Sequence, residues 1–152
     1  MVTDDAGLDP LNPIDNQTPW VARQISAYVA SDGEHGSTQR GAPLLLLTTR
    51  GKKTGRWRRT ALIFGQADGN YLVVASMGGA PKHPAWYLNL TAHPEVYLQV
   101  YDRKVKATAR TARPEEKPDL WGRMVEIWPD YADYQLKTER EIPVVVLEPY
   151  IP

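Results

Sequence analysis

The middle of the chain constrains the fold most, because three apolar runs follow one another with only short turns between them. The first run, residues 43–49, is continuously apolar up to two closing threonines, which is typical of a strand buried on both faces. Glycine-containing turns at 51–56 and 68–70 then predict further strands at 57–65 and 71–76. Three consecutive strands of this kind predict an antiparallel meander.

The segments on either side supply helices and further strands. A helix is predicted from Thr18, with Pro19 at its first position and one apolar face made of Val21, Ile25, Tyr28 and Val29. We expect that face to pack on the core; a lid or a membrane-surface helix is the alternative. Later segments predict helices at 83–92, 114–128 and 131–137 and strands at 96–101, 105–111 and 142–147.

The order of these elements predicts an α+β fold. About six mainly antiparallel strands with helices between them, and no regular strand–helix–strand alternation, indicate a small antiparallel barrel with flanking helices. The length of 152 residues fits one domain. Residues 1–17 carry four aspartates and few large apolar side chains, so we expect a flexible N-terminal arm before a single domain at 18–152.

The composition excludes several classes of function. There is no cysteine, so disulfides, thiol catalysis and iron–sulfur sites are excluded. Eighteen acidic residues balance eighteen basic ones, which disfavours a general nucleic-acid binder. The first residues are acidic and lack an apolar core, and no apolar run approaches the roughly 18 residues of a membrane span, so we expect a cytoplasmic protein.

A strongly basic turn is the first candidate for function. Six of the ten residues from 50 to 59 are lysine or arginine, and no acidic residue lies between Glu34 and Asp68. Such a turn should attract phosphate or carboxylate, with Gly51 and Gly55 letting backbone N–H groups approach the anion. A solvated hairpin tip, whose charges serve solubility, is the alternative.

Two further stretches suit a flat ligand. Gly78 and Gly79 follow a predicted strand, and paired glycines there permit a close approach of the backbone to a flat ring. Trp128, Tyr131 and Tyr134 are three residues apart, so a helix would place them on one side as the wall of an apolar pocket. A plain connecting loop and an ordinary aromatic core patch are the respective alternatives. Together with the basic turn, these stretches predict a site for a flat ring with an anionic tail.

Common catalytic templates are absent from the sequence. There is no dinucleotide-binding, P-loop or serine-hydrolase motif. The three histidines, His35, His83 and His93, do not have the spacing of metal ligands, so we expect no metal site.

Several stretches resemble one known family, in the same order along the chain. Residues 46–60 read LLTTRGKKTGRWRRT and are similar to the LLTTxGRKTGxxR signature of the deazaflavin (F420)-dependent nitroreductase family. The likeness extends to residues 74–90 (VASMGGAPKHPAWYLNL), 128–135 (WPDYADYQ) and 138–149 (TEREIPVVVLEP). It implies a split β-barrel of the FMN-binding, pyridoxamine-phosphate-oxidase-like type that binds coenzyme F420, a deazaflavin with a phosphate and an oligoglutamate tail. It also implies an oxidoreductase that transfers a hydride from the reduced coenzyme, F420H2, to quinones, activated enones or lactones, or nitro-aromatics.

The resemblance also implies roles for individual residues. The phosphate and tail side would be held by Lys52, Lys53, Thr54, Arg58, Arg59, Thr60, Ala61, Leu62 and Ile63. The ring would lie along Val74, Ala75, Ser76, Met77, Gly78 and Gly79. The coenzyme would be closed in by Ala85, Trp86, Tyr87, Leu88 and Asn89, and Lys82 would lie near its anionic groups. The catalytic pocket would be lined by Ser76, Trp128, Tyr131 and Tyr134, with Tyr131 also contacting the coenzyme.

Two positions depart from the family pattern. Met77 stands where the family's Ser-Lys-Gly-Gly version has a lysine, and Trp128 stands where a tyrosine is familiar. The first change removes a positive charge beside the ring; the second removes a hydroxyl and adds bulk. Both bear on the range of acceptors, nitro-aromatics included, rather than on coenzyme binding.

The sequence leaves alternatives open. The same barrel could hold FMN, or the chain could be a non-enzymatic carrier of an anionic ligand. A single-strand nucleic-acid binder could use Trp57 among the arginines, but the zero net charge counts against nucleic acid. For partners we expect a small-molecule hydride acceptor and no nucleic acid, with the protein a monomer or a homodimer and peripheral contact with a membrane left open.

Overall fold

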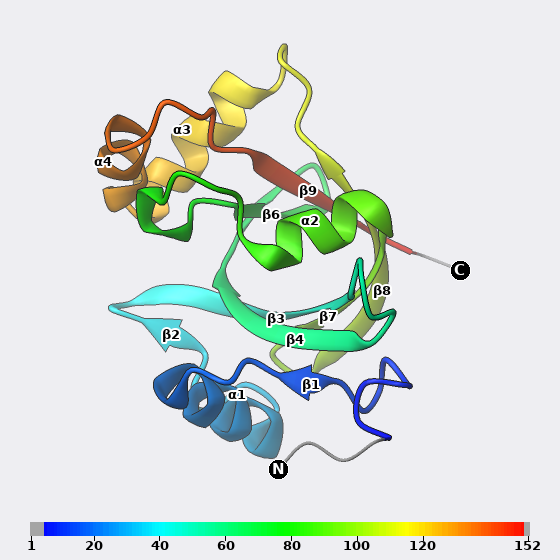
Figure 1. Cartoon of the computed structure of the whole chain (residues 1–152). Helices are drawn as coiled ribbons and strands as arrows, with labels where there is room; N and C mark the ends of the chain where they lie inside the picture. The colour runs from blue at the N-terminus through cyan, green and yellow to red at the C-terminus, as the bar shows by residue number, and fades with distance from the viewer. Residues whose placement is uncertain (1–4, 151–152) are drawn as a thin grey trace.

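A computed structural model describes residues 5–150, and Figure 1 shows a barrel of strands with helices around it. The long strands are β3 (Ala42–Arg50), β4 (Trp57–Ile63), β6 (Asn70–Val74), β7 (Glu95–Val100), β8 (Arg103–Thr111) and β9 (Val144–Pro149). The short strands are β1 (Ile14–Asp15), β2 (Thr38–Gln39) and β5 (Gly65–Ala67). The helices are α1 (Pro19–Ser31), α2 (Ala85–Ala92), α3 (Lys117–Ile127), α4 (Asp130–Leu136) and the 3₁₀ turn η1 (Met77–Gly79).

The strands form one curled sheet. Their pairing order within the described residues is β1-β4-β3-β7-β8-β9-β6-β5, with β2 added to β3. Only Phe64 separates β4 from β5 in sequence, yet these strands lie near opposite ends of that order. The sheet must therefore curl until its two ends approach each other, which makes a barrel with a seam. The predicted α+β class and the mainly antiparallel strands are confirmed.

The predicted meander is only partly present. β3 pairs with β4, and β5 with β6, both antiparallel, but β6 then pairs with β9 instead of β4. The strand predicted at 57–65 is interrupted at Phe64, whose N–H donates to the Pro43 carbonyl oxygen at 3.1 Å. The two halves therefore belong to opposite ends of the sheet. Because Phe64 continues the apolar run that begins at Ala61, the sequence does not mark this break.

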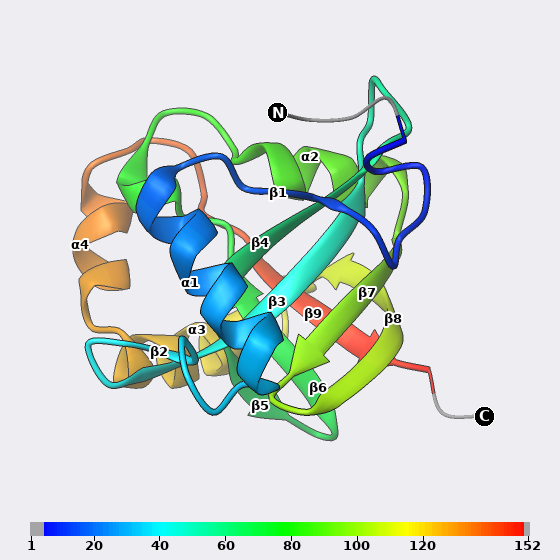
Figure 2. The ribbon, with the colours of Figure 1, turned by 90° about the horizontal axis from the view of Figure 1, so that it is seen from below.

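Two apolar layers explain why β3 is hydrophobic throughout. Leu45 and Leu47 point into the barrel with side chains of β6 to β9, while Leu44 and Leu46 pack outward with α1, α3 and α4. Burial on both faces is thus confirmed for this strand. Helix α1 lies along the outside of the barrel against β4 (Figure 2), as predicted for a core-packed helix. Its predicted apolar face is wrong only at Val29, which is exposed.

A buried hydroxyl joins α1 to the barrel. The Tyr28 side chain is fully buried, and its oxygen lies 3.1 Å from the Leu44 carbonyl oxygen and 3.3 Å from that of Gln99. It also accepts the Tyr101 N–H at 2.7 Å. We expect Tyr28→Phe to lower the free energy of unfolding by about 1–3 kcal/mol, because it removes the buried hydroxyl and leaves the Tyr101 N–H without its acceptor. Chemical denaturation would measure this, with the exposed Tyr150→Phe as a control that should change little; equal effects would contradict it.

The N-terminal segment is docked rather than flexible where the structure describes it. β1 pairs in parallel with β4, Ile14 is buried, and the Trp57 N–H donates to the Gly7 carbonyl oxygen at 2.7 Å. The predicted flexible arm is therefore wrong for residues 5–17; residues 1–4 lie outside the described part. The physical reason is that β4 would otherwise be an open sheet edge, whose N–H and C=O groups need partners.

Candidate active site

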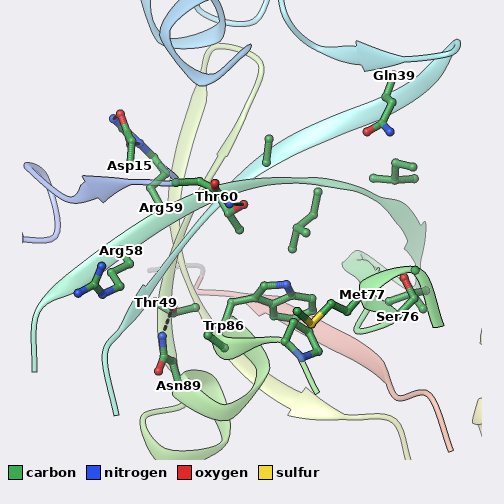
Figure 3. A pocket seen from close by; sticks show the side chains of 18 of the residues that line it. Asp15, Gln39, Thr49, Arg58, Arg59, Thr60, Ser76, Met77, Trp86 and Asn89 are labelled. Atoms are coloured by element: carbon green, nitrogen blue, oxygen red, sulfur yellow. Dashed lines mark hydrogen bonds and ion pairs between the residues drawn. The ribbon is translucent and has the colours of Figure 1, made fainter. Parts of the chain in front are cut away.

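An elongated cavity of about 490 Å³ lies between β4, η1, α2 and α4. Figure 3 shows Arg58, Thr49 and Asn89 toward one end and Ser76 and Met77 toward the other. From β4 the cavity is lined by Arg58, Arg59, Thr60, Ala61, Leu62 and Ile63. The opposite walls are formed by Val74, Ser76, Met77 and Gly78, by Ala85, Trp86 and Asn89, and by Trp128, Tyr131 and Tyr134. The three stretches singled out in the sequence are thus brought together.

The basic turn closes on itself. The Gly51 N–H donates to the Arg56 carbonyl oxygen at 2.7 Å, and the Gly55 N–H to the Gly51 carbonyl oxygen at 2.9 Å. These two amides are therefore not available to an anion, so a backbone N–H that approaches one would have to come from another residue of the turn. The Lys52 N–H donates to Asn89 Oδ1 at 2.9 Å, which ties the turn to α2 at the rim of the cavity.

The arginines of this stretch differ in what they contact. Arg59 makes a bidentate ion pair with Asp15 of β1, with Nε 2.6 Å and Nη2 3.1 Å from the two carboxylate oxygens. Arg56 donates to the Ala6 carbonyl oxygen at 2.7 Å. Arg58 is exposed, lines the cavity, and has no ion pair among the described residues. Arg58 is thus the guanidinium best placed to take an anion within the cavity.

The glycine segment places small residues and backbone against the cavity. Met77, Gly78 and Gly79 have φ of +47°, +65° and +85°, so the backbone makes a left-handed turn that favours glycine. Ser76 is buried and lines the cavity. Its hydroxyl has no hydrogen bond among the described residues. Every side-chain polar atom there that is shut off from solvent does have a partner, so the Ser76 oxygen itself must be accessible, and it opens into the cavity.

The aromatic end carries two phenols. The rings of Tyr131 and Tyr134 meet edge to face, with centroids 6.1 Å apart. The same reasoning as for Ser76 leaves the Tyr131 hydroxyl open to the cavity, and burial raises the pKa of this phenol above its ordinary value. Trp128 Nε1 donates to the Tyr134 hydroxyl at 3.4 Å, and the Arg40 guanidinium lies 4.0 Å from the Trp128 ring centroid. Trp128 is therefore a wall of this end of the cavity, and its N–H is engaged with the Tyr134 hydroxyl.

Other predicted coenzyme residues do not line the cavity. These are Lys52, Lys53, Thr54, Ala75, Gly79, Lys82, Tyr87 and Leu88. Helix α2 turns one face to the cavity, with Ala85, Trp86 and Asn89, which sends Tyr87 toward Thr111 instead (2.8 Å between hydroxyl oxygens). The lysines are exposed on loops beside the cavity.

The N-terminal segment and the β2–β3 hairpin contribute lining residues that sequence reasoning missed. Residues 14–17 form part of the wall through Ile14, Asp15, Asn16 and Gln17. Gln39 of β2 lines the same side of the cavity as Ser76 and Met77, across from them (Figure 3). Asn16 Nδ2 donates to Thr60 Oγ1 at 3.1 Å. Pairing of β1 with β4 and of β2 with β3 brings these residues to the site, and no local pattern in a two-residue strand predicts such pairing.

The surroundings of His83 should make the stability of the protein depend on pH. Burial and the positive charge of Arg140, whose Nη1 lies 3.1 Å from His83 Nδ1, hold the pKa of His83 below its ordinary value of 6.5. The folded state therefore favours the neutral imidazole. The contribution of His83 to the stability of the protein is fully present above pH 6.5 and is lost as the pH falls through the lower pKa of the folded state. We expect the melting temperature of the wild type to fall more steeply below pH 6.5 than that of His83→Asn. The surface variant His35→Asn should follow the wild type; parallel curves for all three proteins would contradict the prediction.

Comparison with known proteins decides the family. The model of the family described as F420H(2)-dependent quinone reductase matches residues 20–149. The chain belongs to this family. An F420H(2)-dependent quinone reductase of Mycobacterium tuberculosis is 40% identical over 142 residues, which cover 84% of this chain and 95% of the relative.

Solved structures support the same assignment. An F420-H2 dependent reductase, FDR-A, has a TM-score of 0.65 at 45% identity, over 70% of this chain and 94% of its own. A chain described as a domain-swapped dimer has a TM-score of 0.67 at 38% identity, over 88% of this chain and 100% of its own. A FAD-binding protein of Mesorhizobium loti, 12% identical with a TM-score of 0.52 over 71% of this chain and 79% of its own, shares the fold alone. The predicted split β-barrel is thereby confirmed.

Membership of the F420H2-dependent quinone reductase family confirms the predicted enzyme class and coenzyme. The chain is an oxidoreductase, and its coenzyme is F420. The cavity fits such a group, since an exposed guanidinium lies toward one end, apolar side chains form the walls, and hydroxyl groups lie toward the other end. The FMN alternative gains no support from the family.

Proposed function

We propose that the chain binds F420H2 in the described cavity and delivers its hydride to a quinone, with activated enones or lactones and nitro-aromatics as further acceptors. One observation supports this most: an elongated cavity joins an exposed arginine at one end to three hydroxyl side chains at the other, namely Ser76, Tyr131 and Tyr134. A flat ring with an anionic tail matches this arrangement, with its tail at the arginine and its ring toward the hydroxyl groups.

The basic turn and the start of β4 would hold the phosphate and the glutamate tail. Arg58 would form charge-assisted hydrogen bonds with an anionic oxygen inside the cavity. Lys52 and Lys53 lie on the adjoining turn, so they would meet the tail as it leaves the cavity. Arg59 has a different role, because Asp15 already neutralises it.

The middle of the cavity would hold the deazaflavin ring, which supplies the hydride when bound. Val74, Met77 and Trp86 give it apolar walls, and Gly78 has no side chain to keep the ring away. These residues exclude water and fix the orientation of the ring, which is what the protein contributes when a coenzyme carries the chemistry.

The hydroxyl end would receive the acceptor. Hydride addition to a quinone or enone places negative charge on the carbonyl oxygen, and a hydroxyl donor beside that oxygen stabilises the charge. Tyr131 suits this role, because its hydroxyl opens into the cavity and has no hydrogen-bond partner among the described residues. Tyr134 and Ser76 would donate alongside it, and the proton that completes the reduction would come from tyrosine or water.

Two residues would set the range of acceptors. Met77 is half exposed and places a thioether where a lysine would add positive charge. Trp128 is buried and narrows the hydroxyl end. Both residues take a polar group away from beside the acceptor, a positive charge at Met77 and a hydroxyl at Trp128, and we expect this combination to disfavour nitro-aromatics relative to quinones.

The setting of the reaction is also part of the proposal. We expect a cytoplasmic monomer or homodimer, with a chain 38% identical being described as a domain-swapped dimer. Among the described helices, none has the length and apolar character to span a bilayer. Leu8, Leu11 and Trp20 are exposed on the N-terminal side, and they support peripheral contact with a membrane that holds quinones.

A binding titration tests the coenzyme assignment. Oxidised F420 should bind saturably at micromolar concentration, and FMN at the same concentration should not displace it. A protein that purifies yellow with bound flavin, or that binds FMN and not F420, would overturn the assignment.

A further inference from the structure

Arg140 lies in the loop before β9, and its side chain reaches the segment that contains η1. Its Nε donates to the Ala80 carbonyl oxygen at 2.8 Å, Nη2 to the Ser76 carbonyl oxygen at 2.8 Å, and Nη1 to the Ala75 carbonyl oxygen at 3.2 Å. Nη1 also lies 3.1 Å from His83 Nδ1. One guanidinium therefore ties together residues from both ends of this segment.

Helix α4 fixes the other side of the same segment. Gly79 is buried, and a Cβ on it would lie 2.7 Å from the Tyr134 carbonyl oxygen. Within the segment, the Gly79 N–H donates to the Ser76 carbonyl oxygen at 2.9 Å and the Ala80 N–H to that of Met77 at 3.1 Å. The turn is thus held between the guanidinium and α4, with Ser76 and Met77 facing the cavity (Figure 3).

The contacts of Arg140 are unlike those of a surface ion pair. Within the described residues it has no carboxylate partner, and its neighbour Glu141 pairs with Lys117 at 2.9 Å instead. A guanidinium offers five N–H donors in a planar fork, whereas an ammonium is a compact point charge. The three carbonyl oxygens and one imidazole nitrogen around Arg140 suit the several N–H donors of a guanidinium and could not all be reached by a lysine ammonium in the same geometry.

We propose that Arg140 is a positioning residue for hydride transfer. By holding the carbonyls of Ala75, Ser76 and Ala80, it fixes the surface that residues 76–78 present to the ring of the coenzyme. Arg140 does not line the cavity, so it acts through this segment and not on the acceptor. The inference rests on the proposed function, because it takes the ring to lie along this segment.

Two variants and a matched control test the proposal. Arg140→Gln removes the fork, Arg140→Lys keeps the charge, and Arg123→Gln removes an exposed arginine on α3 that pairs only with Asp119 among the described residues. Two readouts are needed: hydrogen exchange of the Gly79 and Ala80 amides without coenzyme, and single-turnover oxidation of bound F420H2 by a quinone.

We expect Arg140→Gln to speed exchange at both amides at least about tenfold and to slow hydride transfer at least about tenfold, since several hydrogen bonds to a charged group are lost. The dissociation constant for F420 should change less than about threefold, because the basic turn is intact. Arg140→Lys should lie between Arg140→Gln and the wild type, and Arg123→Gln should match the wild type; if Arg140→Gln does not fold, Arg140→Lys carries the comparison.

Unchanged exchange at Gly79 and Ala80, or unchanged hydride transfer with faster exchange, would overturn the role of Arg140. If the wild type did not bind F420 at all, the proposed function would fail separately. The exchange measurement needs no coenzyme, so it would then show whether Arg140 holds the segment, and the hydride-transfer role would fall with the proposed function.

Discussion

Replacing Gly79 with alanine should disable the enzyme. The added Cβ would lie 2.7 Å from the Tyr134 carbonyl oxygen and 3.1 Å from Lys137 Cβ, and φ of +85° is strained for any L side chain. We expect the free energy of unfolding to fall by about 2–4 kcal/mol, from backbone strain and overpacking together. Because the segment must move off α4, oxidation of F420H2 by a quinone should drop below detection.

The neighbouring glycine gives a matched control. Gly78 also has positive φ (+65°), but no atom lies within 4 Å of the position of its added Cβ. Gly78→Ala should therefore cost only about 1 kcal/mol, from backbone strain alone. Denaturation curves and steady-state rates measure both variants. If they are equally stable, contact with α4 does not fix the segment.

The double variant Lys53→Ala/Arg58→Ala should raise the dissociation constant for F420 about 100-fold, because two hydrogen bonds to a charged group are lost at about 1.5 kcal/mol each. Arg58 lines the cavity and Lys53 lies on the turn beside it. The loss should shrink as salt is added, since exposed charges are screened. Fluorescence titration at two salt concentrations measures both effects.

Two controls separate this prediction from a general effect of charge. Lys104→Ala/Arg123→Ala removes the same charge from exposed positions that do not line the cavity, and it should leave F420 affinity unchanged. Tyr134→Phe removes a hydroxyl at the opposite end and should slow turnover more than it weakens binding. Equal weakening of F420 binding by Tyr134→Phe and by the basic double variant would contradict the division into a tail end and an acceptor end.

Local patterns predict much of this architecture because they depend on neighbours in sequence. The alternation of apolar runs and glycine turns located the barrel strands, and Asp68-Gly69 adopts the left-handed turn that joins β5 to β6. The basic turn, the paired glycines and the aromatics were each visible as short motifs, and the fold brings them to one cavity.

Contacts between distant residues were not predictable in the same way. Asp15 meets Arg59 across 44 positions, and Arg140 reaches Ala75 across 65. Only the curl of the sheet and the return of the chain before β9 bring these partners together. The sequence therefore suggested six like charges at the turn. In the structure, Arg59 pairs with a carboxylate, and Arg50 and Arg56 donate to backbone carbonyl oxygens.

Anaerobic oxidation of F420H2 by a menaquinone-like quinone, followed through the visible absorption of the oxidised coenzyme, tests the central claim most directly. We predict turnover that depends on enzyme and quinone concentration, falls in Tyr131→Phe, and is greater for quinones than for nitro-aromatics. Tight F420 binding without any hydride transfer to quinones, enones or nitro-aromatics would contradict the claim.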